Sequence, residues 1–128
     1  EVLDIRHAHL NCDVFLSSVN AMTLDGRMVS TDGVGNRIAA MIFGPKKVVL
    51  VIGANKIVEN LDAAFSRVRD VCAPLALNNL GVETPCAQTG ICAKCNNGNR
   101  LCRATVILDA RPLETEMTVI VVGEELGF

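Results

Sequence analysis

The chain has 128 residues and a formal net charge of −2, and half of its residues are hydrophobic, although it contains four Phe and neither Tyr nor Trp. A mean hydropathy of +0.36 excludes a disordered protein, and the length fits one domain with its own core. A pI near 5.6 and the missing aromatic rings argue against nucleic-acid binding, which needs basic charge and stacking surfaces. No apolar run approaches the roughly 20 residues of a membrane-spanning helix, so we expect no membrane span.

The first half of the chain predicts two extended segments and a short helix. Asp13–Thr23 is expected to be one buried extended segment, an Asp-Gly pair at 25 and 26 is a turn signal, and Arg27–Thr31 returns as a strand. After a glycine-containing break, a helix is expected over Arg37–Ile42. The side chain of Asn36 is predicted to cap that helix by accepting a free amide of its first turn.

The second half begins with the clearest strand in the sequence. Lys46–Gly53 contains an unbroken, mostly β-branched run, which is typical of a strand buried on both faces in a parallel sheet covered by helices. A helix with apolar residues at spacings of three and four follows over Asn60–Cys72, with Arg67 on its polar face. Two strands close the chain, at Ala104–Leu108 and Met117–Val122. This alternation predicts an α/β fold with a largely parallel sheet.

The connection before the closing strands carries a cysteine cluster. It begins with Pro74, which is expected to lie beyond the end of the helix, and it has room for one short helical turn at Leu75–Leu80. Such a long irregular connection normally has a reason. Its segment 84–103 is a cysteine-rich loop, in which four cysteines form a C-x5-C-x2-C-x6-C pattern: Cys86, Cys92, Cys95 and Cys102.

These four thiols predict a metal site. Zinc and iron–sulfur clusters both accept four cysteine ligands, and the spacing favours neither. A metal cross-link would also order a loop with few apolar side chains. Two disulfides, redox-active thiols and inert thiols are the alternatives. Because the chain shows no signal peptide, we expect a cytoplasmic protein, and clustered cysteines in a reducing compartment more often bind metal than form disulfides.

The loop before the predicted short helix is a candidate anion site. Gly33 and Gly35 allow a sharp turn and a close approach to a ligand, the helix amino end offers free amides, and Arg37 suits a carboxylate or phosphate. Lys56, at the end of the aliphatic strand, is expected to converge on this pocket. We therefore expect Arg37→Ala to weaken anion binding with little change in melting temperature. The alternative is a tight turn in which the arginine pairs with an acidic side chain at the surface.

Several stretches, taken in order, resemble one family. They are DVFLSSVNA at 13–21, DG at 25–26, DGVGNR at 32–37, NKIV at 55–58 and the ending VGEELGF at 122–128. Together they resemble the LUD domain of bacterial lactate-utilization proteins. The cysteine loop is similar to that of a subset of LUD proteins, many of them from anaerobic bacteria. The resemblance covers nearly the whole chain.

The resemblance implies an α/β fold of the type shared by ribose-5-phosphate isomerase, glucosamine-6-phosphate deaminase and CoA transferases. It also implies a role near the oxidation of lactate to pyruvate. Family members usually carry a further helical segment before this region, and the chain lacks an initiator Met. We therefore expect 1–128 to be a single LUD-like domain that is truncated at its amino end.

Two main functions are expected. The first is an accessory or electron-transfer component of lactate oxidation, with iron–sulfur partner subunits and an iron–sulfur cluster or zinc on the cysteine loop. The second is an enzyme or binding protein for a small anion such as a hydroxy acid, a phosphosugar or an acyl-CoA, with a homo-oligomer as one option for its assembly. A thiol switch at Cys92 and Cys95 is a third reading. The candidate ligand-binding residues are Asn20, Asp32, Gly33, Gly35, Asn36, Arg37 and Lys56.

Overall fold

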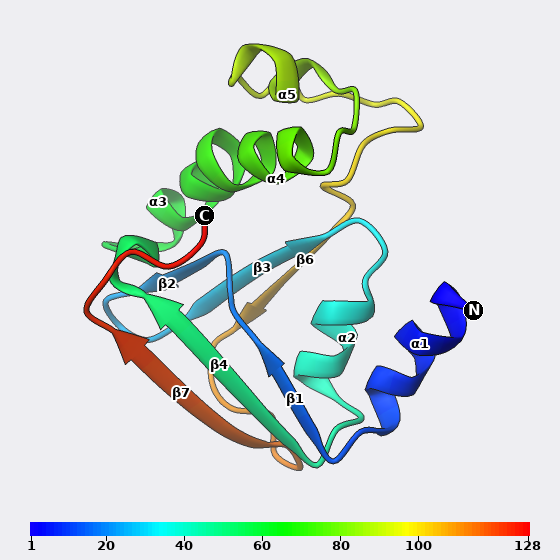
Figure 1. The fold of residues 1–128 in the computed structure, drawn as a ribbon. Helices are drawn as coiled ribbons and strands as arrows, with labels where there is room; N and C mark the ends of the chain where they lie inside the picture. Colours follow the sequence, from blue (N-terminus) through cyan, green and yellow to red (C-terminus); the bar gives the residue numbers. More distant parts are fainter.

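The computed structural model describes all 128 residues and contains two small sheets with helices around them (Figure 1). The first sheet is parallel, with the order β1-β4-β7: β1 (Val14–Ser17), β4 (Lys47–Gly53) and β7 (Glu116–Val122). The second is mixed, with the order β5-β2-β3-β6: β5 (Ile57–Val58), β2 (Ala21–Thr23), β3 (Met28–Asp32) and β6 (Ala104–Leu108). Only the β2–β5 pair is parallel in this second sheet. The predicted α/β class is confirmed.

Eight helical segments connect these strands. They are α1 (Val2–Ala8), η1 (His9–Asn11), α2 (Asn36–Ile42), η2 (Ala54–Lys56), α3 (Leu61–Arg67), η3 (Val68–Cys72), α4 (Ala73–Asn79) and α5 (Pro85–Thr89). Figure 1 shows α3 and α4 running across one end of the sheets, with α5 beyond α4 and the cysteine-rich loop returning to β6. None of the helices combines the length and the apolar character needed to span a bilayer.

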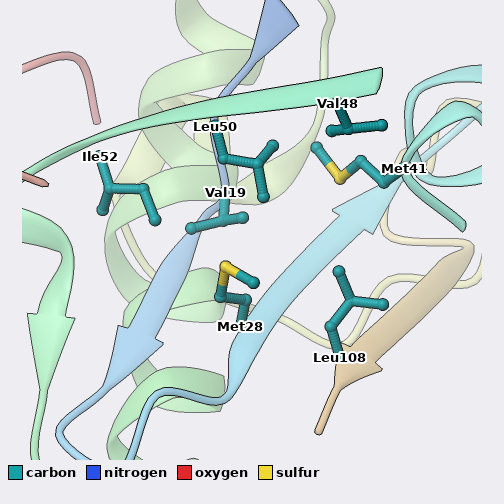
Figure 2. Packing of buried hydrophobic residues seen from close by; sticks show 7 residues of the cluster. All are labelled: Val19, Met28, Met41, Val48, Leu50, Ile52 and Leu108. Atoms are coloured by element: carbon teal, nitrogen blue, oxygen red, sulfur yellow. The ribbon is translucent and has the colours of Figure 1, made fainter. Parts of the chain in front are cut away.

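The main core lies between the two sheets and is filled by aliphatic and methionine side chains, as Figure 2 shows. Its members are Val19, Met28, Met41, Val48, Leu50, Ile52 and Leu108. Alternate residues of β4 therefore point inward, whereas Val49 and Val51 are only partly buried. The prediction that this strand is buried on both faces is wrong, because the outer face of its sheet is partly open. Leu16, which is paired with Val49 on that face, is 68% exposed.

The predicted single segment Asp13–Thr23 is divided between the two sheets. β1 ends at Ser17 and β2 begins at Ala21, so residues 18–20 carry the chain from one sheet to the other. Asn20 fixes this crossing: its backbone N–H donates to the Val29 carbonyl over 3.0 Å, and its side-chain oxygen accepts from the Thr31 N–H over 2.8 Å. The crossing places Ser18 and Asn20 at the carboxyl end of β1, where ligands of parallel sheets gather.

The helix predicted to end at Cys72 continues to Asn79, so the prediction of its end is wrong. The elements α3, η3 and α4 follow one another without a break, and η3 is a π-helical turn. Pro74 lies in the first turn of α4, where its missing N–H is accommodated by the widened turn before it. The wide turn also changes the helix phase. Phe65 and Val71, predicted on the apolar face, are 38% and 39% exposed, whereas Arg67, predicted on the polar face, is 8% exposed.

Candidate functional site

The amino end of α2 is capped by a carboxylate from β3. Gly35 occupies the N-cap position with a φ of +91°, a conformation that favours glycine, and it provides no side-chain cap. Asp32 supplies the missing acceptor, because its Oδ2 accepts from the Ile38 N–H over 3.0 Å. The prediction that Asn36 caps the helix is wrong, since Asn36 is the first helical residue. The partial positive charge of this helix end is therefore already matched by Asp32.

The guanidinium of Arg37 is held by groups of the protein itself. Its Nε donates to Asp32 Oδ1 over 2.9 Å, and one terminal nitrogen donates to the Ser18 carbonyl over 2.9 Å. The other terminal nitrogen donates to Asn20 Oδ1 over 3.2 Å and to the Thr31 carbonyl over 3.1 Å. This network ties α2 to the crossing between the sheets. The pairing with an acid agrees with the alternative interpretation, but the acid is not at the surface, since the Asp32 side chain is only 11% exposed.

Gly33 brings the cysteine-rich loop close to this network. A side chain at position 33 would approach within 2.8 Å of the Leu101 side chain and 3.2 Å of the Leu101 backbone. In addition, the Arg103 N–H donates to the Asp32 carbonyl over 3.1 Å. The sequence predicts that a ligand approaches the backbone at Gly33. In the structure, the end of the cysteine-rich loop makes this close approach instead.

A cavity of about 300 Å³ lies between this network, α4 and the end of the cysteine-rich loop. Four predicted ligand residues line it, whereas Gly35, Asn36 and Lys56 do not. Those four are Asn20, Asp32, Gly33 and Arg37. The remaining lining residues are mostly apolar: Thr31, Val68, Cys72, Ala73, Ala76, Leu77, Leu80, Leu101 and Cys102. The cavity therefore combines a polar end at the sheets with an apolar wall on α4, a pattern typical of small-molecule sites.

Lys56 lies at the carboxyl end of β4 and is buried, with 6% of its surface exposed. The carboxyl-terminal segment covers it, since Asn55 donates to the Gly127 carbonyl over 2.9 Å. The Nζ of Lys56 donates to Ser18 Oγ over 3.0 Å. Burial lowers the pKa of Lys56 below its ordinary value of 10.5; the nearby charges of Arg67 and Arg37 lower it further, against an opposing effect of Cys72.

Arg67 is a buried cation that the sequence interpretation placed on the wrong face. One terminal nitrogen donates to Cys72 Sγ over 3.5 Å, and the Nε has no partner. The Cys72 thiol in turn donates to the Asn20 carbonyl over 3.5 Å, so Arg67 is connected to the wall of the cavity. One signal in the sequence indicated that Arg67 is buried. This residue lies at the border of the apolar stripe, one turn before the buried Cys72.

The four predicted metal ligands face one small cavity. Cys86 lies in α5 and is buried, and Cys92, Cys95 and Cys102 are half-buried in the loop that follows. All four line a space of about 50 Å³. All six cysteines of the chain are free thiols, and no three His, Cys, Asp or Glu side chains are arranged to share a metal ion.

Two arginines organise the cysteine-rich loop through its carbonyl groups. Arg100 donates to the Cys102 carbonyl over 2.7 Å and to the Cys95 carbonyl over 3.2 Å, and Arg103 donates to the Gly98 carbonyl over 2.9 Å. Burial raises the pKa of the Cys102 thiol, and the neighbouring thiols Cys86, Cys92 and Cys95 raise it further, partly offset by Arg100. The Cys102 thiol thus faces the same small cavity as the other three thiols of the loop.

The two cavities share a wall. Ala73 and Leu77 from α4 and Leu101 and Cys102 from the cysteine-rich loop line both the larger cavity and the space between the thiols. A centre built on the four thiols would therefore adjoin any molecule bound in the larger cavity.

Comparisons with known proteins agree with the arrangement of motifs along the chain. The model of the family described as LUD domain matches residues 1–122. No curated protein and no solved structure matches the chain. The family model covers nearly all of the chain, including both sheets and the cysteine-rich loop. The chain therefore belongs to the LUD domain family, and it is a lactate-utilization-associated protein.

Proposed function

We propose that this domain serves the oxidation of lactate as an accessory or electron-transfer component whose four loop cysteines hold a metal centre. The observation that carries the proposal is the shared wall: Leu101 and Cys102 line both the thiol cluster and the larger cavity. An electron-transfer centre must lie close to the molecule that it oxidises or reduces, and this arrangement provides that proximity. We further propose a cytoplasmic location and iron–sulfur partner subunits.

The chemistry of the donor set fits a four-thiolate metal. Cys86, Cys92, Cys95 and Cys102 would be the ligands, with no His or carboxylate among the residues around their cavity. Lys94, Arg69 and Arg100 line the same cavity, and their charges offset those of thiolates. A bound zinc ion would supply a structural cross-link, and an iron–sulfur cluster would supply one-electron chemistry. The pKa of Cys102, which burial raises, would fall once a metal held its thiolate.

Anaerobic purification followed by metal analysis and visible spectroscopy tests this centre. We expect stoichiometric metal in the wild-type protein and its loss in Cys95→Ser, together with a lower melting temperature. Cys12→Ser is the matched control, because Cys12 lies outside the loop and donates to the His9 carbonyl. Iron with acid-labile sulfide and broad visible absorbance supports electron transfer, and zinc restricts the centre to a structural role. A metal-free protein that stays folded would contradict the proposal.

A second candidate function is the binding of a small anionic molecule in the larger cavity. The observation that favours it is the lining, in which Arg37 and Asn20 face the apolar side chains of Leu77, Leu80 and Leu101. Such a cavity suits a small organic acid or the acidic end of a larger ligand. We expect lactate or pyruvate to shift the amide NMR signals of Asn20 and Leu101 in a saturable manner. The signal of Gly26, in an exposed turn, is the internal control, and equal small shifts at all three would contradict specific binding.

A further inference from the structure

One short stretch of the cysteine-rich loop, Leu101–Cys102, belongs to both cavities. Its two residues line the larger cavity, and they also line the space between the four thiols. Cys102 is the only thiol of the cluster that reaches the larger cavity, because Cys86, Cys92 and Cys95 line the thiol space but not the larger cavity. A change in the position of this stretch therefore changes the shape of both sites.

On one side, this stretch lies against the polar end of the larger cavity. Leu101 packs on Gly33, where a side chain would approach the Leu101 backbone to 3.2 Å. The Arg103 N–H donates to the Asp32 carbonyl over 3.1 Å. Gly33 and Asp32 both line the larger cavity, and Asp32 pairs with Arg37. The position of Leu101 is thus set directly beside residues that a bound molecule is expected to meet.

On the other side, one guanidinium ties the stretch to the thiol cluster. Arg100 donates to the Cys102 carbonyl over 2.7 Å and to the Cys95 carbonyl over 3.2 Å. Residues 90–103 contain neither helix nor strand, so contacts of this kind determine the course of the backbone there. A displacement of either cysteine is therefore passed on to the stretch that forms the wall of the larger cavity.

Metal binding by the four thiols requires such a displacement. The thiols share a space of about 50 Å³, yet no three of them are arranged to share a metal ion. Zinc binds thiolate sulfur at about 2.3 Å, so the sulfur atoms must draw together around the ion. Cys86 lies in helix α5, whereas Cys102 lies in the irregular segment before β6. The adjustment therefore falls on the irregular segment, which includes the shared stretch.

We propose that Leu101 is a positioning residue that couples the two sites: metal on the four thiols fixes Leu101 against a molecule bound in the larger cavity and strengthens the binding of that molecule. The inference rests on both proposed functions, since it concerns the metal centre and a small organic acid. Once metal–thiolate bonds order the shared stretch, acid binding no longer includes the cost of ordering it. Because the coupling of two binding equilibria is reciprocal, the acid strengthens metal binding by the same factor.

Calorimetric titration of the reduced full chain with pyruvate, with and without bound Zn²⁺, tests this coupling. Zn²⁺ is the probe metal because it has no redox chemistry of its own. We expect the wild type to bind pyruvate about fivefold more tightly when zinc is bound, a factor within the range of coupled sites. In Leu101→Ala, which keeps all four thiols, we expect the two affinities to be equal. Ile91→Ala is the matched control and keeps the wild-type ratio, because Ile91 lies in the same loop, is 72% exposed and lines neither cavity.

A second readout follows the coupling without any acid. Gly33 lines the larger cavity and contacts Leu101, but it lies outside the thiol space. We therefore expect Zn²⁺ to shift the amide NMR signal of Gly33 in the wild type, and to shift it less in Leu101→Ala. The signal of Gly26, in an exposed turn, is the internal control. If the metal-free chain does not fold, the two zinc-loaded variants are compared, and only Leu101→Ala is expected to bind pyruvate more weakly than the wild type.

The outcomes separate this coupling from the two functions on which it rests. Pyruvate binding that is equal or weaker in the presence of zinc would overturn the coupling and leave both functions in place. The same holds for a Gly33 signal that zinc does not move, and for equal pyruvate affinities of the zinc-loaded Leu101→Ala and Ile91→Ala proteins. A chain that binds no zinc would overturn the coupling together with the metal centre. A chain that binds no pyruvate would overturn it together with the second function.

Discussion

Arg37 and Lys56 both donate to Ser18, yet the protein compensates their charges in different ways. Arg37 meets a carboxylate, two backbone carbonyls and a side-chain amide, so its donors are used by the fold. Lys56 meets one hydroxyl, and its neighbour Arg67 meets one thiol. The carboxyl end of the parallel sheet thus has one cation with a counter-charge, Arg37, and two cations without one, Lys56 and Arg67.

This difference separates a cation that stabilises the fold from cations whose burial is not compensated. A paired arginine stabilises the elements that it connects, and an incoming anion would have to compete with its existing partners. A buried cation without a counter-charge adds nothing to stability, because the cost of removing it from water is not offset. The expectation that Arg37→Ala leaves the melting temperature unchanged therefore changes: the structure predicts a loss of stability at Arg37.

The largest loss of stability is expected from Asp32→Ala, which tests the structural role of Arg37. The change leaves Arg37 without its carboxylate and removes the acceptor of the Ile38 N–H at the start of α2. We expect the free energy of unfolding to fall by about 3 kcal/mol, the lower end of the range for breaking a buried ion pair, because the Arg37 side chain remains 27% exposed. Urea unfolding monitored by circular dichroism measures the change.

Asp13→Ala is the matched control for this prediction. Asp13 also pairs with a cation, Lys46, over 2.9 Å, but both side chains are 83% exposed. Exposed ion pairs contribute little to stability, so we expect almost no change in the unfolding midpoint. Equal losses in Asp13→Ala and Asp32→Ala would show that burial does not distinguish the two pairs, and an unchanged midpoint in Asp32→Ala would remove the structural role assigned to Arg37.

Much of the fold could be predicted from local patterns. The β-branched run of β4, the turn before β3 and the two closing strands all lie close to their predicted positions. These local patterns did not show which strands pair with one another. A periodic pattern cannot show that the extended segment Asp13–Thr23 changes sheets, because the crossing depends on hydrogen bonds between Asn20 and a strand that comes later in the chain.

The candidate site could be predicted only in part, because local patterns do not show contacts between distant segments of the chain. Three residues of the motif DGVGNR, namely Asp32, Gly33 and Arg37, line the larger cavity, and turn chemistry and helix starts made this motif visible because they are local features. Its partners were not local: Asp32 neutralises Arg37, and Leu101 approaches Gly33 from a distant loop. Arg67 was assigned to solvent because helical periodicity does not determine residues at the border of the apolar stripe, and the π turn after it alters the phase.

The smallest expected effect is the change with pH in the contribution of Lys56 to the free energy of unfolding. Because burial lowers its pKa in the folded protein, the unfolded chain binds more protons than the folded one between that lowered pKa and 10.5. The penalty for burying the charge is fully present below the lowered pKa and is relieved as pH rises through the interval. We therefore expect wild-type stability to rise relative to Lys56→Met across this interval, measured by urea unfolding at a series of pH values.

The charged and titratable groups around Lys56 determine how this measurement is made. Arg67 on α3, Arg37 on α2 and Cys72 on η3 all act on the pKa of Lys56. Both proteins are therefore compared in a Cys72→Ala background, which removes the thiol that opposes the effect of burial on Lys56. If the stability difference between them stays constant with pH, Lys56 is fully compensated in the folded protein, and the contrast with Arg37 disappears. If the difference narrows as the pH rises, the charge of Lys56 lacks a compensating partner in the folded protein.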